Sequence, residues 1–409
     1  MLSFYYNFIK KNFLIMVPLI LVLTRFPFLD FVDLRFTKLI SFQFYDVLLI
    51  FSASIIFIKN PSKFYDFNLI LLLIFSFLYP VFSVLNYKGK FGISETFVST
   101  FLASSFYIIG KYVYSLSNDE TKLIKIIFLF IIIFSIVPLI SNITAIIQNG
   151  FMVGREVHLI WSELDFYSAT VFAIFFALNV SLFPLLLISV KKKEEKTIKK
   201  VAAFIFIAGL LCVANLLTRT SFILIGISAL TVIGILDRDN IRSYIFKLII
   251  LGFVVIILMA SFLSLLKISP LYIRFFVQSG DTGFLYTRSH IWDEALDLLI
   301  KYPMGGTQRL STALYAHNLW LDVGYKTGII VLTVLLIFTI RYLAIVRILI
   351  FKRKLSMILR TIILCLSVGF LGTFMVEPIM EGAFLFFCFF CFFFGMFYSL
   401  NKQISFRHF

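Results

Sequence analysis

The sequence predicts an all-α integral membrane protein with about twelve transmembrane helices and one long extracytoplasmic loop. Of its 409 residues, 61% are hydrophobic and only 14% are charged, whereas a typical soluble domain is roughly 45–50% apolar and about 25% charged. The mean hydropathy is +1.02. Apolar runs near the length that crosses about 30 Å of hydrocarbon recur along the chain. This composition excludes a cytosolic enzyme, a secreted disulfide scaffold and a disordered chain.

The membrane spans are predicted from apolar runs that are long enough, or nearly so, to cross a bilayer. No internal repeat or low-complexity linker separates these runs, so residues 1–409 are interpreted as a single polytopic membrane domain. In chain order, the predicted spans lie at 13–30, 39–58, 67–87, 91–110, 126–147, 164–190, 201–217, 221–236, 248–266, 319–340, 361–376 and 382–399.

The distribution of basic residues predicts which loops face the cytoplasm. With the amino terminus inside and alternating spans, the inner segments hold 24 Lys and Arg in 86 residues, and the outer segments hold 12 in 93. The two densities differ more than twofold in the direction of the positive-inside rule. The net charge of +16 is therefore mostly a topology signal, and we do not expect nucleic-acid binding. Residues 191–200 and 341–360 are predicted to be cytoplasmic, where they face anionic membrane lipid.

Cysteine and phenylalanine usage indicates packing rather than chemistry. The four cysteines lie inside apolar runs, and Cys388 and Cys391 form a C-x-x-C within FLFFCFFCFFFG. A redox pair needs an accessible thiolate, so we expect buried, inert thiols. The 53 phenylalanines are expected to face lipid.

The long loop covers residues 267–318 and is predicted to lie on the outer face. Loops of this length are usually functional. Within it, the run HIWDEALDLLIKYP places Ile291, Ala295 and Leu298 at helical spacing, which predicts a short amphipathic helix over 290–303. Its apolar face would pack against the membrane domain or the lipid interface.

Several side chains of this loop are candidates for contact with a substrate. Arg288 precedes the predicted helix, His290 and Trp292 stand at its start, and Arg309 follows it. We assign His290, Trp292 and Arg309 to substrate binding. The alternative for the tryptophan is a place in the interfacial aromatic belt.

The loop ends in the run AHNL, where the tenth predicted span begins. Asn318 is predicted to cap this helix. A histidine beside a helix amino terminus experiences positive potential, which disfavours the imidazolium, so the neutral ring can accept a proton. His317 is therefore a candidate general base, and the alternative is that it only caps the loop or hydrogen-bonds to it.

Arginines gather on the same predicted face. Arg219 stands between two apolar runs, in LTRT, and its planar guanidinium suits bidentate contact with phosphate. Arg155 is assigned to substrate binding on topology alone. Snorkelling to the interface explains any one of these arginines, but it explains less well why Arg155 and Arg219 share one side with His317.

Three motifs occur in order along the second half of the chain. They are LTRT at the end of one span, RSHIWDEALDLLIKYPMGG in the long loop, and AHNLWLDVGYKTGII entering the next long span. Together they resemble the bacterial O-antigen polymerase and ligase superfamily (the Wzy and WaaL type), over roughly residues 200–340. The first half of the chain matches only in hydrophobicity and number of spans. The motifs are fairly specific for the superfamily and poorly specific for its branch.

The resemblance implies a membrane glycosyltransferase of the GT-C kind, in the inner membrane of a bacterium, with its active site facing the periplasm. Its donor would be an oligosaccharide on undecaprenyl diphosphate, and a chain-length regulator is a further candidate partner. By motif, Arg219 is implied to engage the diphosphate, Arg288 is carried over as the arginine before the amphipathic helix, and His317 is implied to activate the acceptor hydroxyl. Asn318 is assigned to substrate binding beside it. Because the acidic residues of the outer face are scattered among arginines, we expect no metal and no cofactor.

Three functions stay open at this point. A polymerase joins repeat units on the lipid carrier, whereas a ligase moves the finished glycan to lipid A core or to a protein hydroxyl. The ligase branch often has an acidic residue after the His-Asn pair, and Leu319 at that place favours a polymerase. A flippase or secondary transporter should show charged or broken spans near the midplane and two similar halves. This chain has few charges within its spans, with Asp322 and Lys326 as the main ones.

Overall fold

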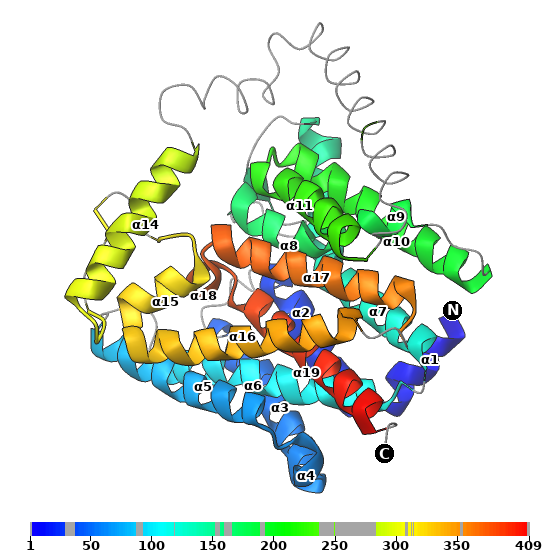
Figure 1. Cartoon of the computed structure of the whole chain (residues 1–409), viewed down its shortest axis with the longest axis horizontal. Helices are drawn as coiled ribbons and strands as arrows, with labels where there is room; N and C mark the ends of the chain where they lie inside the picture. Colours follow the sequence, from blue (N-terminus) through cyan, green and yellow to red (C-terminus); the bar gives the residue numbers. More distant parts are fainter. Residues whose placement is uncertain are drawn as a thin grey trace, which may run out of the picture. The chain divides into compact units, whose positions relative to one another are not determined.

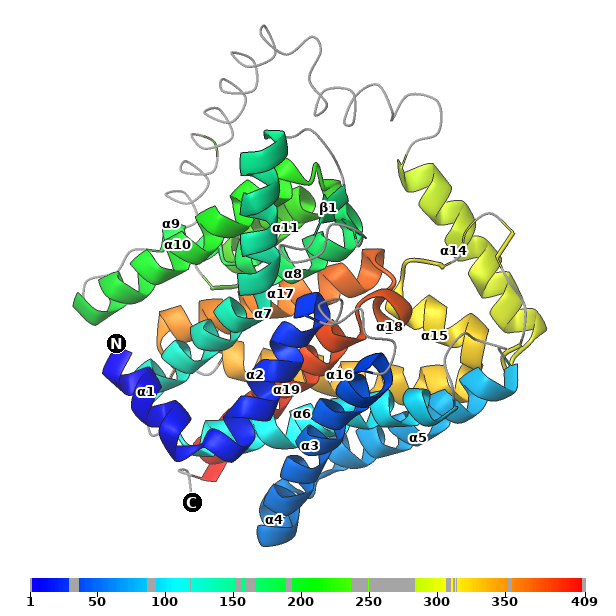
Figure 2. The same cartoon turned by 180° about the vertical axis from the view of Figure 1, so that it is seen from behind.

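Over the residues that it describes, the computed structural model is predominantly helical, with one pair of short antiparallel strands (Figures 1 and 2). The predicted helical class is therefore confirmed for the part of the chain that the structure describes. The described residues are 2–28, 37–86, 93–117, 119–151, 156–158, 166–188, 193–236, 249, 284–306, 310–311, 313, 315–351 and 355–406.

The chain divides into two compact units. The first unit comprises Met1–Leu123, Ile291–Leu349 and Glu377–Phe409, and the second comprises Ile124–His290 and Ile350–Val376. The first unit holds α1 (Leu2–Lys11), α2 (Phe13–Phe28), α3 (Thr37–Lys59), α4 (Pro61–Phe64), α5 (Phe67–Asn86), α6 (Ile93–Ser115), α15 (Leu319–Thr327), most of α16 (Ile329–Phe351), α18 (Ile379–Gly382) and α19 (Phe384–Phe406). The second holds most of α7 (Glu120–Asn149), β1 (Glu156–His158), β2 (Phe166–Ser168), α8 (Ala169–Ser181), α9 (Pro184–Leu187), α10 (Lys193–Asn215), α11 (Arg219–Leu236) and α17 (Met357–Val376). Helix α14 (Phe284–Lys301) begins in the second unit and continues into the first.

Seven helices of the described residues are long and apolar enough to cross a membrane. Shorter apolar helices cover Phe13–Leu23 and Phe67–Ser83. Every predicted span overlaps a helix except 248–266, which lies outside the described residues apart from Ile249. Together with the composition, these helices indicate a membrane-embedded protein. The seven are Glu120–Asn149, Ala169–Leu187, Lys193–Asn215, Arg219–Leu236, Ile329–Phe351, Met357–Val376 and Phe384–Ile404.

Two predicted spans differ from the helices of the structure in where the helix begins or breaks. The predicted helix over 319–340 breaks at Gly328, which has φ +89° and ends α15, and α16 then runs on to Phe351. A Cβ at Gly328 would lie 2.6–2.7 Å from main-chain atoms of residues 303–305, so both the backbone conformation and the close approach require glycine here. Within the predicted span 164–190, the helix begins only at Ala169, because the residues directly before it form β2.

Helix α6 is the central helix of the first unit and packs against α3, α5 and α19 (Figure 2). Glycines let α6 and α19 approach closely. A Cβ on Gly110 would overlap the carbonyl oxygen of Phe392, and a Cβ on Gly395 would overlap that of Tyr107. Small residues that bring backbones together are typical of interfaces between membrane helices. The contact between α6 and α19 therefore depends on these two glycines.

Among the described side chains of α19, eight phenylalanines are buried, so the expectation that they face lipid is wrong for these residues. Their rings pack against Phe338 and Tyr342 of α16 and Tyr107 of α6. Cys388 and Cys391 lie among them, and all four cysteines are free and buried as predicted. The α19 phenylalanines at most 1% exposed are Phe386, Phe387, Phe389, Phe390, Phe392, Phe393, Phe394 and Phe397.

Helix α8 is the central helix of the second unit and packs against α10, α11 and α17 (Figure 1). A Cβ at Gly209 of α10 would lie 2.6 Å from Cβ of Asn179 on α8, so α10 also uses a glycine for close packing. The strand pair adds Val157 to this core, where it joins Phe172 and Leu216. These contacts place the strands beside the turn that connects α10 to α11.

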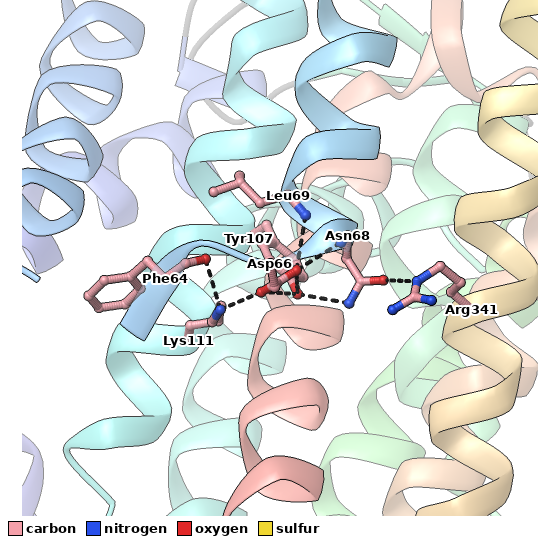
Figure 3. Close-up of polar contacts among 7 residues, drawn as sticks. All are labelled: Phe64, Asp66, Asn68, Leu69, Tyr107, Lys111 and Arg341. Atoms are coloured by element: carbon pink, nitrogen blue, oxygen red, sulfur yellow. Dashed lines mark hydrogen bonds and ion pairs between the residues drawn. The ribbon is translucent and has the colours of Figure 1, made fainter. Parts of the chain in front are cut away.

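A buried polar network joins α5 and α6 in the first unit (Figure 3). Asp66, directly before α5, accepts a hydrogen bond from Oη of Tyr107 at 3.1 Å and one from the main-chain N–H of Asn68 at 2.8 Å. Lys111 of α6 forms an ion pair with Asp66, and the two side chains are only 3% and 7% exposed. The carboxylate thus caps α5 and balances a buried ammonium at the same time.

Arg341 of α16 extends this network. Its Nε donates to Oδ1 of Asn68 at 2.5 Å, and Nδ2 of Asn68 donates to Oη of Tyr107 at 3.2 Å. The guanidinium also lies over the ring of Phe67, 4.8 Å from its centroid. Residues far apart in the sequence therefore tie the start of α5 to α6 and α16 (Figure 3).

Candidate functional site

The part of α14 that belongs to the first unit forms a small core with the segment that follows it. Ile291 and Ala295 of α14 pack against Leu310, Ala316 and Tyr325, and all five are at most 6% exposed. The predicted amphipathic helix is present with its predicted apolar face inward. It begins earlier than expected, at Phe284, and ends at Lys301.

Side chains of α14 hold the segment between α14 and α15, which we call the return segment (residues 302–318). Nε1 of Trp292 donates to the carbonyl oxygen of Ala316 at 2.9 Å. The main-chain N–H of Ser311 donates to Oε1 of Glu294 at 2.6 Å. The indole N–H of Trp292 is therefore used inside the protein, where it fixes the residue that precedes His317.

His317 lies in a sharp turn directly before α15 and is half-buried. Its φ is +54°, in the left-handed region that residues other than glycine seldom adopt. Asn318 caps α15 as predicted, because its Oδ1 accepts from the main-chain N–H of Trp320 at 3.1 Å and of Leu321 at 3.2 Å. Residues held in such conformations concentrate at functional sites.

The carboxylate of Asp322 holds this turn from within α15. Its Oδ1 accepts from the main-chain N–H of Ala316 at 2.8 Å, and its Oδ2 accepts from that of Asn318 at 3.2 Å. The Asp322 side chain has no solvent exposure. The two donors stand on either side of His317, so one buried group contacts both flanks of the histidine.

Lys326 balances this charge one helical turn further on. Its Nζ lies 4.0 Å from Oδ1 of Asp322 and 4.6 Å from the centroid of the Tyr315 ring. The Tyr315 ring meets the His317 ring edge to face, with 6.4 Å between centroids. The two charges that the sequence places within a span therefore form a pair next to the candidate base.

In the second unit, Arg219 is the first residue of α11 and is half-buried. A three-residue turn, 216–218, connects α10 to α11, and Leu217 within it has φ +54°. Oγ1 of Thr218 donates to Oγ of Ser221 at 3.1 Å, inside the first turn of α11. Helix amino termini carry partial positive charge, so a guanidinium at this position adds to a potential that favours anions.

Helices α11 and α17 of the second unit run antiparallel. A Cβ on Gly372 of α17 would overlap Leu224 of α11, and seven residues earlier in α17, the thiol of Cys365 lies close to Ser228 of α11. The later residue of α17 therefore lies beside the earlier residue of α11, which is the order expected for antiparallel helices. As a result, the beginning of α11 and the end of α17 lie at the same end of the second unit.

This arrangement brings two predicted arginines to one end of the unit. Nη1 of Arg288 donates to the carbonyl oxygen of Val376, the last residue of α17. Val376 is about 6 Å along the helix from Gly372, and Arg219 is about 7.5 Å along α11 from Leu224, at 1.5 Å per residue. Arg219 and Arg288 therefore lie at the same end of the second unit.

The predicted site residues fall into four groups. His317, Asn318 and Trp292 come together in the first unit, and Arg219 and Arg288 share one end of the second. His290 is exposed on α14. Arg155 and Arg309 lie outside the described residues.

Sequence reasoning missed the roles of two acidic residues. Asp322 contacts both flanks of His317, and Glu294 holds the return segment. Asp46 is a further buried acid, 1% exposed within α3. For Asp322 and Asp46 a general signal was available, because an ionisable residue inside a predicted membrane helix is a functional candidate by default. Glu294 lies in the predicted outer loop, where this signal does not apply.

Comparison with known protein families and with characterised proteins finds no match for this chain. Among the described residues, no group of three or more His, Cys, Asp or Glu side chains could hold a metal ion. The family resemblance therefore depends on the three sequence motifs.

Proposed function

We propose that this chain is a membrane glycosyltransferase of the bacterial inner membrane, and specifically an O-antigen or surface-polysaccharide polymerase of the GT-C kind with about twelve spans. It transfers a glycan from undecaprenyl diphosphate to the hydroxyl of another lipid-linked repeat unit at the periplasmic face. The observation that carries the proposal is the His317 turn. A half-buried histidine stands there in a left-handed conformation, directly before a capped helix amino terminus.

In this proposal His317 is the general base. The acceptor hydroxyl oxygen bonds to the anomeric carbon of the donor while its proton passes to the imidazole. The bond between that carbon and the diphosphate oxygen breaks, and undecaprenyl diphosphate leaves with the electron pair. A general base typically contributes about 10²–10⁴-fold to such a step. The adjacent amino terminus of α15 disfavours a positive ring before the reaction, which keeps the histidine ready to accept a proton.

Arg219 and Arg288 stabilise the leaving diphosphate in this proposal. Fixed positive charge in a water-poor site is an effective way to stabilise charge that develops on a leaving group. Support comes from their common position at one end of the second unit and from the dipole of α11, which adds positive potential at Arg219. No step requires a metal.

Deletion of the gene followed by a lipopolysaccharide gel tests the function. A polymerase predicts lipid A core that carries a single repeat unit. The alternative, an O-antigen ligase, predicts bare core with the glycan retained on the lipid carrier. Restoration by the wild-type chain controls for effects on neighbouring genes, and an unchanged glycan pattern would overturn both functions.

The orientation in the membrane gives a separate prediction. Reporter fusions after residue 195 and after residue 300 should give opposite signals, cytoplasmic for the first and periplasmic for the second. The reason is the concentration of 24 of the 37 basic residues in the predicted inner segments. Like signals from the two fusions would contradict the orientation and, with it, a periplasmic active site.

The arginines give a prediction about geometry as well as charge. Arg219→Lys and Arg288→Lys should keep the protein level and lose most of the glycan product, because a lysine cannot reproduce a bidentate guanidinium contact with phosphate. The readout is product formed per membrane-inserted protein. Arg360→Lys is the matched control, since its Nη1 also donates to a main-chain carbonyl, that of Ile350 at 3.3 Å. Full activity in a lysine variant would show that its arginine does not bind the diphosphate.

A further inference from the structure

We propose that Asp322 is the positioning residue of this site, and that its buried carboxylate holds His317 in the conformation in which the ring acts as a base. The inference rests on the proposed function of His317. It adds a residue that acts through the histidine without contact with the substrate.

The hydrogen bonds of Asp322 are placed to control His317. Its two oxygens accept from the main-chain N–H groups of Ala316 and Asn318, at 2.8 and 3.2 Å, and these residues are the immediate neighbours of the histidine. The backbone between them has φ +54°. A left-handed residue with a Cβ persists only where its surroundings determine the conformation, and Asp322 supplies two of the contacts that do so.

The chemistry of this position requires a carboxylate. Both partners are N–H donors, so the side chain must accept at two atoms at once. An ionised carboxylate accepts at both oxygens, whereas an amide in the same place would direct its own N–H₂ at one of the donors. A buried carboxylate is stable only when it is hydrogen-bonded and paired with an opposite charge. Lys326 supplies that charge, with its Nζ 4.0 Å from Oδ1 of Asp322.

Other contacts fix the turn around this carboxylate. Trp292 holds the carbonyl of Ala316, and Asn318 caps α15 with its own side chain. The position of the turn in the first unit is thus set by several groups. The contacts of Asp322 differ from these because they fix the residues on both sides of His317. They thereby fix the direction in which the imidazole ring points from the backbone.

Asp322→Asn tests the proposal against a matched control, Glu294→Gln. Each variant turns a carboxylate that accepts from the return segment into an amide, which keeps one accepting oxygen. Glu294→Gln can therefore still accept from its single donor, Ser311, whereas Asp322→Asn cannot serve both of its donors. Only the donors to Asp322 flank His317. In purified protein with a lipid-linked donor, Asp322→Asn should lower kcat by about tenfold or more and change KM by less than about twofold, because it disturbs the base and leaves donor binding intact. Glu294→Gln should change kcat by less than about threefold.

A double variant separates a positioning role from a merely structural one. If Asp322 acts through His317, the variant His317→Ala/Asp322→Asn should be no slower than His317→Ala alone, because residues that act as a unit are not additive. Equal losses of kcat in Asp322→Asn and Glu294→Gln, or a further loss in the double variant, would overturn the proposal. If Asp322→Asn does not fold, Asp322→Glu replaces it. This variant should lower kcat at unchanged KM, because the carboxylate is kept but is displaced by the length of one methylene. Normal kcat in the glutamate variant would also overturn the proposal.

Failure of the proposed function is a different result. A fully active His317→Ala variant would contradict the assignment of His317 as the base, independently of the kcat values of the Asp322 variants. A slow His317→Ala variant combined with normal kcat in Asp322→Asn overturns the positioning proposal alone.

Discussion

His317→Asn is expected to lower the rate of glycan transfer by about 10²–10⁴-fold while the protein still inserts and still binds its donor. Asparagine is the sharpest replacement because it tolerates the left-handed region better than most residues, and φ at this position is +54°. The turn should therefore keep its shape, whereas an amide cannot accept a proton at neutral pH. His317→Gln and His317→Ala should be similarly inactive.

The measurement is the transfer rate of purified protein with a defined lipid-linked donor, with donor binding and expression measured separately. His158→Ala serves as the control, since this residue lies on β1 and not at the start of a helix. Its effect should be small. Near-normal turnover in His317→Asn would show that the residue orients the loop rather than accepting a proton, and the base assignment would have to be abandoned.

Local patterns predicted the helical fold class and parts of the site. Apolar runs identified the helices, the spacing of Ile291, Ala295 and Leu298 identified α14, and the preference of asparagine for helix amino termini identified the cap at Asn318. These features are set by residues within a few positions of one another. Such short-range rules are visible in a single sequence.

The features that sequence reasoning missed depend on contacts between distant residues. The break at Gly328 follows from the close approach of residues 303–305, and a hydrophobic run carries no sign of that approach. Eight phenylalanines of α19 are buried because α6 and α16 cover them, although phenylalanine is equally suited to a surface that faces lipid. The role of Asp322 became visible only when the turn before α15 brought two N–H groups to its carboxylate.

The polar network of the first unit gives the second large expected effect, on stability. Asp66→Asn should lower the free energy of unfolding by about 3–5 kcal/mol, because it leaves the Lys111 ammonium buried without its counter-charge. Asparagine is an effective helix cap, so the hydrogen bonds to the start of α5 are kept and the variant isolates the loss of charge. Lys111→Met should cost less, since the Asp66 carboxylate keeps three donors, the N–H groups of Asn68 and Leu69 and Oη of Tyr107.

Denaturant titration in detergent measures these changes, and the double variant is decisive. Asp66→Asn/Lys111→Met removes both charges together and should be markedly more stable than Asp66→Asn, because replacing a buried pair is far less costly than breaking it. Asp119 and Lys122 provide the matched control. They form an ion pair at 3.8 Å but are 52% and 40% exposed, so Asp119→Asn should change the free energy of unfolding by only about 0–1 kcal/mol. A double variant no more stable than Asp66→Asn would mean that the Asp66 carboxylate stabilises the first unit through its hydrogen bond from Tyr107, and not by balancing Lys111.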